Sequence, residues 1–231
     1  MKKAIVIFLL AVFGYFMAIT FLDPQFEAGR NRHGVKDVYL DKTKSELKTA
    51  NTVTAIVVNF RGFDTLGEVT VLFLAATALG SILFKKRHHI CDRTVLLPAS
   101  SIVSAGAKLI FPAIIVLGAY VFIHGHLTPG GGFQGGTIIA TGFLLMLIAY
   151  RDFSISHNVL SVIESLAGIG FVTFGLLGFM NGGTFLQNFL GTGMLNDLFS
   201  GGVIPIIYIL VGFKVAAELT GLIYTILHEK G

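Results

Sequence analysis

Six long apolar runs constrain this chain more than any other feature of its sequence. A helix that crosses about 30 Å of hydrocarbon needs roughly 20 mostly apolar residues, and each run is close to that length. The runs cover residues 4–22, 66–84, 106–123, 133–150, 159–180 and 203–227. The sequence therefore predicts an all-α fold, in the form of a polytopic integral membrane protein with about six transmembrane helices.

Composition excludes a soluble enzyme. Hydrophobic residues make up 54% of the 231 residues and charged residues 13%, whereas soluble domains carry roughly a quarter charged residues. Cys91 is the only cysteine, so the chain cannot form an intrachain disulfide or hold a cysteine-based zinc or iron–sulfur site by itself. The formal charge of +4 is attributed to orientation in the bilayer, and no nucleic-acid partner is expected.

The first run resembles a signal peptide because Lys2 and Lys3 precede it. Its apolar part is longer than the apolar core of a typical signal sequence, and residues 23–26 offer no small-x-small cleavage site. We therefore interpret residues 4–22 as a retained span.

Basic residues in the short loops predict the orientation of the chain. With six spans both ends lie on the same side, and the loops around 124–132 and 181–202 on the opposite side contain no Lys or Arg. The positive-inside rule then places both termini in the cytoplasm, in a multi-pass protein of the cytoplasmic membrane. Residues 23–65 carry seven basic residues on the predicted outer side, and long loops obey this rule weakly. The basic residues of the short loops are Lys2, Lys3, Lys85, Lys86, Arg87, Arg93, Arg151 and Lys230.

A basic stretch from Lys85 to about Ser104 predicts a boundary between two parts. Residues 1–100 would hold two transmembrane helices and a polar loop at 23–51, and residues 101–231 would hold four transmembrane helices. Within the first part, residues 52–60 are apolar but too short to span, so we expect an interfacial or partly inserted element there.

A glycine-rich hinge between two spans is the most distinctive segment of the chain. It follows His124 and His126, and its dinucleotide-like and P-loop-like spacings fail because a membrane helix precedes it and Thr137 stands where the P-loop needs Lys. One interpretation is a close-packed turn. The other is a hinge that lines an ion path, with either histidine as a proton carrier. A metal site is not expected, because no carboxylate lies nearby in sequence. The hinge residues are Pro129, Gly130, Gly131, Gly132, Phe133, Gly135 and Gly136.

Ionisable residues within the spans are candidates for an ion path, because each is costly in a bilayer unless it is paired or solvated. Lys214 and Glu218 share one helix face at i and i+4, either as an ion pair or as partners of another helix or subunit. Glu164 is either a carboxylate at a helix start, favoured by the dipole, or a proton-releasing acid.

Two further carboxylates and one lysine lie near span ends. Asp64 and Glu68 either cap a helix and pair with Arg61 or collect cations at a pore mouth. We expect Lys108 to extend its ammonium to the membrane interface.

These residues belong to a recognisable pattern. From Gly106 to the C-terminus, the chain resembles the MnhB/MrpB subunit family of multisubunit Na⁺/H⁺ antiporters, through Pro112, Tyr120, the His-Gly-His hinge and the sequence Pro-Gly-Gly-Gly-Phe-Gln-Gly-Gly. Upstream, residues 59–68 are similar to a segment near the C-terminal end of the large MrpA subunit, which is a separate MbhE-type subunit in membrane-bound hydrogenases. The chain resembles a fusion of the two.

The resemblance implies a membrane subunit of an Mrp-type cation/proton antiporter module, with Na⁺ and H⁺ as the transported ions and no cofactor on this chain. It favours a ferredoxin-driven respiratory complex similar to a membrane-bound hydrogenase or sulfane reductase. The expected partners are other Mrp-like membrane subunits, hydrogenase-like or iron–sulfur subunits and the lipid bilayer, and the chain by itself is not expected to be an enzyme. The alternatives are a subunit of a free-standing Mrp antiporter and an assembly scaffold without an ion path.

Overall fold

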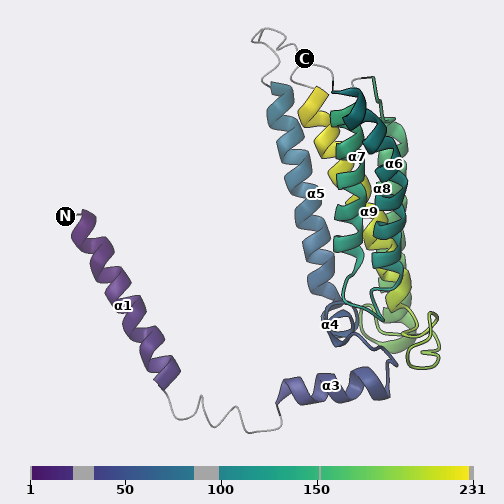
Figure 1. The fold of residues 1–231 in the computed structure, drawn as a ribbon. Helices are drawn as coiled ribbons and strands as arrows, with labels where there is room; N and C mark the ends of the chain where they lie inside the picture. The colour runs from purple at the N-terminus through teal and green to yellow at the C-terminus, as the bar shows by residue number, and fades with distance from the viewer. Residues whose placement is uncertain (1, 23–33, 86–98, 151, 229–231) are drawn as a thin grey trace. The chain divides into compact units, whose positions relative to one another are not determined.

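The structure is a computed structural model that describes residues 2–22, 34–85, 99–150 and 152–228. All regular secondary structure in these residues is helical (Figure 1). The chain forms two compact units, Met1–Lys42 and Thr43–Gly231. The predicted all-α, polytopic class is confirmed, while the domain boundary expected near residue 100 remains a prediction.

The first unit contains α1 (Lys2–Leu22) and most of α3 (Val35–Ser45). The helix α1 coincides with the first predicted span, and its segment Val6–Ile19 is apolar but shorter than the segments found in the other candidate spans. The helix α3 is polar, and its start is closed by Asp37, whose carboxylate accepts a hydrogen bond of 3.0 Å from the Gly34 amide.

Five helices of the second unit are long and apolar enough to cross a membrane, among the residues described. Each lies within five residues of its predicted bounds, and most begin earlier because their first turns are polar; Ser100, for example, caps α6 through the Val103 amide. The helices are α5 (Gly62–Lys85), α6 (Ser101–Ile123), α7 (Gly132–Ala149), α8 (His157–Gly182) and α9 (Ile204–His228).

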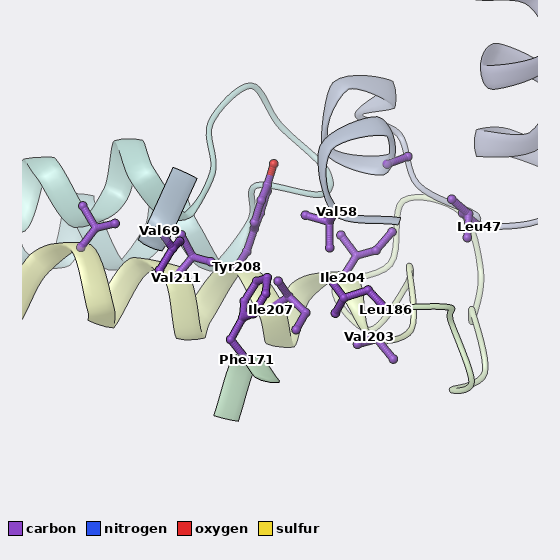
Figure 2. Close-up of a cluster of buried hydrophobic side chains, with 12 residues drawn as sticks. Leu47, Val58, Val69, Phe171, Leu186, Val203, Ile204, Ile207, Tyr208 and Val211 are labelled. Atoms are coloured by element: carbon purple, nitrogen blue, oxygen red, sulfur yellow. The ribbon is translucent and has the colours of Figure 1, made fainter. Parts of the chain in front are cut away.

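The last helix, α9, is the centre of the bundle. It packs against α5, α6, α7 and α8 (Figure 1). Its buried residues recur at helical spacing. Figure 2 shows Ile204, Ile207, Tyr208 and Val211 on this helix at the core, together with Phe171 of α8. A helix that is apolar on several faces is expected at the interior of a membrane bundle.

Small residues allow α7 to lie close to α9 and α6. A Cβ added at Gly136 would be 2.7 Å from the Gly212 carbonyl oxygen, and one added at Gly135 would be 2.6 Å from that of Gly118. Such close backbone approach is a general means of helix association in membranes, where apolar burial gives little advantage over lipid.

The apolar segment 52–60 forms two short elements, α4 (Thr52–Ala55) and the π-helical turn η1 (Ile56–Phe60). Ala55 and Val58 are buried in the same core as the start of α9. Figure 2 shows Val58 beside Ile204. Thr65 of α5 donates a hydrogen bond of 2.6 Å to the Val57 carbonyl, which joins the turn to the next helix. The segment is therefore a packed element at the end of the bundle.

Candidate ion-path site

Three charged side chains that the sequence singles out meet between α8 and α9. The Lys214 Nζ atom lies 3.2 Å from Glu164 Oε1 on α8 and 3.3 Å from Glu218 Oε2, one turn further along α9. The structure thus combines both alternatives for Lys214, since it pairs within its own helix and with a neighbouring one. We call Glu164, Lys214 and Glu218 the charged triad.

The charged triad is buried. Lys214 is 8% exposed and Glu218 4%, while Glu164 is partly exposed. A third helix contributes Phe73 of α5, whose ring centroid lies 5.2 Å from Lys214 Nζ, and the ring quadrupole attracts the ammonium there. Three helices therefore enclose the lysine head group.

The triad lies deep in the bundle. Lys214 is 10 residues after Ile204 and 14 residues before His228, which at 1.5 Å per residue is roughly 15 and 21 Å from the two helix ends. Glu164 lies in the second turn of α8 or beyond, because α8 begins at His157 and no acidic residue lies in its first turn. Of the two alternatives for Glu164, the position disfavours a helix-start carboxylate, since the dipole acts mainly within the first turn. The alternative of a proton-releasing acid stays a prediction.

A cavity of about 330 Å³ leads from the carboxylates of the triad toward one end of the bundle. It lies between α5, α8 and α9, and Glu164 and Glu218 are part of its wall. Hydroxyl groups and a histidine line the rest of its polar surface, and the last of them lie in the terminal turns of their helices. These residues are Thr77, Ser81, His157, Ser161 and Thr225.

The triad has an uneven charge. Two carboxylates face one ammonium, so the fully ionised group carries one net negative charge, and a single added proton neutralises it. Groups that can exchange a proton next to a cavity with hydroxyl groups in its wall are a suitable element of a proton path, and ionisable residues in spans commonly serve as one.

Asp64 and Glu68 lie elsewhere. Asp64 forms an ion pair with Arg61 at the start of α5, as one of the two alternatives predicted, and both side chains are more than half exposed. Glu68 is exposed one turn later. The structure does not bring either carboxylate to the charged triad, and a role in cation collection stays a prediction.

The two histidines have different environments. The His124 ring stacks on Tyr120 with centroids 4.3 Å apart, and its Nδ1 atom lies 3.2 Å from the Tyr120 carbonyl oxygen. His126 is completely buried, and burial lowers the pKa of its imidazole, an effect that the backbone of Asp197 and Leu198 partly offsets. Neither histidine reaches the triad, which lies toward the middle of α9.

The hinge is shorter than expected. Its loop comprises residues 124–131, while Gly132, Phe133, Gly135 and Gly136 already belong to α7. Pro129 is exposed, and Gly130 has φ +148°, a conformation that favours glycine. Gly131 is extended, and a Cβ at this position would be 3.0 Å from the Tyr208 ring.

Sequence reasoning missed the residue that fastens this loop. The Asn51 Nδ2 atom donates to the carbonyls of Gly125 at 3.0 Å and Thr128 at 2.9 Å, and the Asn51 amide donates to the His126 carbonyl at 3.1 Å. Its Oδ1 atom caps α4 by accepting from the Val53 and Thr54 amides. An asparagine before a short apolar segment is a known cap signal, but its partners lie more than 70 residues away in sequence.

Thr54 and Tyr208 add two further hydrogen bonds to those that hold the hinge loop. The Thr54 hydroxyl donates to the Gly125 carbonyl at 2.6 Å, and the Tyr208 hydroxyl donates to Thr54 Oγ1 at 3.2 Å. The hinge is thereby tied to α4 and to α9. These bonds favour the interpretation of the hinge as a close-packed turn.

The fold and the buried triad together define a polytopic helical membrane protein with a charged group inside its bundle. A family model described as a domain related to the MnhB subunit of Na⁺/H⁺ antiporters matches residues 102–221, and the MbhE model, which describes a subunit of MBH, matches residues 5–100. Because the first match covers more than half of the chain, the protein belongs to the MnhB-related family, as its sequence resemblance implied.

Individual proteins extend the comparison. An uncharacterized protein of Methanocaldococcus jannaschii is 33% identical over 224 residues, covering 85% of this chain and 83% of that protein. A chain of the membrane-bound sulfane sulfur reductase, an archaeal respiratory membrane complex, is 45% identical with a TM-score of 0.81 over 98% of both chains. A chain of the Mrp complex from a Dietzia species shares the fold at a TM-score of 0.71 and 22% identity, and this protein covers 26% of that longer chain.

Proposed function

We propose that this chain is a membrane subunit of an Mrp-type Na⁺/H⁺ antiporter module within a respiratory complex similar to the sulfane sulfur reductase. The likeness to a chain of that complex extends over 98% of both chains, whereas the Mrp chain with the same fold is about four times as long. The higher identity to the sulfane sulfur reductase chain, 45% against 22%, therefore favours the respiratory assembly over the free-standing antiporter.

The proposed partners are other Mrp-like membrane subunits, together with hydrogenase-like or iron–sulfur subunits that carry the electrons. The proposed location is the cytoplasmic membrane, with both termini in the cytoplasm. This placement is supported by the loops 124–132 and 181–202, which lack Lys and Arg and join helices at the same end of the bundle.

This chain would contribute ion translocation, and its partner subunits would carry the redox chemistry. The electron donor and acceptor would bind to the partner subunits, and Na⁺ and H⁺ would be the ions that the module exchanges.

The charged triad is the observation that carries the proposed ion path. Lys214 Nζ lies between two carboxylates at 3.2 and 3.3 Å, so its ammonium occupies the place that a bound metal cation would take. A proton can move among these groups without displacing the lysine. We therefore assign the triad to protons, with the cavity of α5, α8 and α9 as the route to the cytoplasmic end.

The experiment replaces Glu218 or Glu164 with Gln in the intact complex and measures Na⁺-driven proton movement in inverted membrane vesicles. Loss of transport from a complex that still assembles supports the proton path, because the amide keeps the shape but cannot exchange a proton. Glu46→Gln, which alters an exposed carboxylate outside the spans, is the control. Loss of assembly in parallel with transport would instead favour a scaffold.

The choice of complex has its own test. Mass spectrometry of the complex purified through a tag on this chain should find iron–sulfur or hydrogenase-like subunits beside Mrp-like membrane subunits. A complex that contains only antiporter-type subunits, including a large MrpA-like chain, would contradict the respiratory assignment.

A further inference from the structure

A second cavity lies on the other side of the contact between α8 and α9. It has a volume of about 560 Å³ and is bounded by α6, α7, α8, α9 and the loop 153–156. Because α6 and α7 pack together on α9, and α8 packs on α9, the cavity is a groove between α8 and the α6–α7 pair, with α9 as its floor. We call it the α8 groove.

The α8 groove begins at one membrane surface and ends near the middle of the bundle. Its shallow end is the loop 153–156, where α7 ends and α8 begins. Its deepest residues include Ile139, 10 residues before the end of α7, and Ile115, 14 residues after the start of α6, which is roughly 15 and 21 Å along the helices. This depth matches one leaflet, about half of a 30 Å hydrocarbon core.

The lining of the groove is apolar in depth and polar at its mouth. Aromatic and aliphatic side chains form its walls, and Ser154 and Ser156 lie at the loop. Thr220 contributes a hydroxyl further in. The principal apolar wall residues are Phe111, Ile115, Ile139, Phe143, Ile163 and Phe213.

A cation lies toward the shallow end of the same surface. Lys108 precedes Phe111 by three residues and Ile115 by seven, so it shares their face of α6. It is exposed, and its Nζ atom lies 5.1 Å from the centroid of the Tyr150 ring, next to the end of α7. The polarity of the groove therefore matches that of a lipid. Its apolar depth suits the hydrocarbon tail, and the hydroxyls and the ammonium toward its shallow end suit the head group.

The polarity of the groove favours a lipid over a helix of another subunit. Its apolar depth suits a hydrocarbon chain, and the Lys108 ammonium toward its shallow end suits an anionic phosphate. A single hydrocarbon chain can follow the groove through one leaflet.

We propose that the α8 groove binds one hydrocarbon chain of a glycerophospholipid, with the phosphate of the lipid near Lys108. The bound chain fills the space between α8 and the α6–α7 pair. Leu160 and Ala217 line both this groove and the cavity of the charged triad, so the lipid supports the helix contact on which the triad is built. The binding itself is independent of ion transport.

The test uses the complete complex, delipidated in detergent and then supplied with dioleoyl phosphatidylglycerol or with dioleoylglycerol, which has the same chains and no phosphate. Native mass spectrometry releases this chain and counts the lipid that it retains. Wild type should retain the phospholipid, and Val159→Trp, which places a large ring at the groove mouth, should lose it. Lys108→Gln should weaken retention of the phospholipid and leave that of dioleoylglycerol unchanged.

Val162→Trp is the matched control, because Val162 is 57% exposed on the same helix as Val159 at 55% and does not line the groove. Equal retention by both tryptophan variants, or no retained lipid in wild type, overturns the proposal. A photoreactive benzoylphenylalanine at position 159, irradiated in native membranes, gives a second measurement. An adduct with lipid mass supports the proposal, and an adduct with another subunit contradicts it.

Discussion

Lys214 shows how one residue can hold several helices together. Its ammonium contacts a carboxylate on its own helix, another on α8 and a ring on α5. In a buried position, the cost of removing a charge from water is offset only when the partners are close and well placed. The triad is therefore a structural element as well as a candidate proton site.

Lys214→Met should destabilise the complex by about 3–5 kcal/mol, because two carboxylates would lose their counter-charge in a buried place. The measurement is the thermal unfolding of the purified complex. Adding Glu218→Gln to Lys214→Met should restore part of the loss, since it removes one of the uncompensated charges. Lys44→Met, on the exposed side of α3, is the control and should change little. A double variant no more stable than the single one would argue against charge imbalance as the cause.

His126 should make the hinge sensitive to acid. Its pKa in the folded chain is lowered by burial, so below the unfolded value of about 6.5 the unfolded or opened chain binds more protons than the folded chain. Acidification from pH 7.5 to 5.5 should therefore favour opening, by at most about 1.4 kcal/mol per pH unit. Hydrogen exchange of residues 124–131 in the complex measures this, and His126→Gln should flatten the dependence.

Short elements at one end of the bundle depend on a few polar contacts. The hinge, α4 and the start of α9 are joined through Asn51, Thr54 and Tyr208. On the other side of the same end, Asn188 fastens the loop before α9 by donating to the Gly201 carbonyl at 3.1 Å and accepting from the Val203 amide at 3.2 Å. Irregular backbone near a membrane is stable only where such partners satisfy it.

Asn51→Ala should cost about 2–3 kcal/mol, because it removes a helix cap and two hydrogen bonds to the hinge. Hydrogen exchange should rise in residues 51–55 and 124–128 together. Asn181→Ala is the matched control, because the exposed Asn181 amide donates only to the Leu177 carbonyl one turn away. Faster exchange confined to residues 51–55 would show that the hinge does not depend on Asn51.

Gly136→Ala should separate α7 from α9 and destabilise the bundle by about 1–3 kcal/mol. The added Cβ would lie 2.7 Å from the Gly212 carbonyl oxygen and 2.8 Å from Val215 Cβ, and backbone cannot move aside as a side chain can. Gly106→Ala on α6 meets nothing within 4 Å and should be neutral or stabilising. Thermal unfolding of the two variants in the complex makes the comparison.

Across the bundle, successive helices alternate in direction, so α7 and α9 begin at one end and α6 and α8 begin at the second end. This arrangement agrees with the sequence, because the segments that precede α6 and α8 contain Lys or Arg, whereas those that precede α7 and α9 contain neither. The cavity of the triad runs toward that second end. Under the proposed proton path, the orientation of the chain decides from which side of the membrane protons reach the triad.

Cysteine labelling can establish this orientation. With Cys91 replaced by Ser, a membrane-impermeant maleimide should label Met194→Cys in right-side-out vesicles and Ser154→Cys only in inverted ones. Both positions are exposed and lie at opposite ends of the bundle. The reverse pattern would place the termini outside and the triad cavity on the outer side.

Local sequence patterns predict the long helices and single out the charged residues within them. Apolar runs of membrane-spanning length predicted each long helix to within a few residues, because hydrophobic length is a local property of the chain. The i and i+4 spacing of Lys214 and Glu218 placed them on one helix face, and the cost of a charge in a bilayer made them candidates for an ion path. The hinge also stood out, although its glycines serve helix packing as much as bending.

The contacts between these residues come from the tertiary structure. Glu164 lies 50 residues before Lys214, and Asn51 lies 74 residues before Gly125, so no local pattern could pair them. It also separated Asp64, Glu68 and both histidines from the triad, and it formed the two cavities on either side of the contact between α8 and α9. The physical reason is that spacing fixes the face of a helix, whereas packing fixes what that face touches.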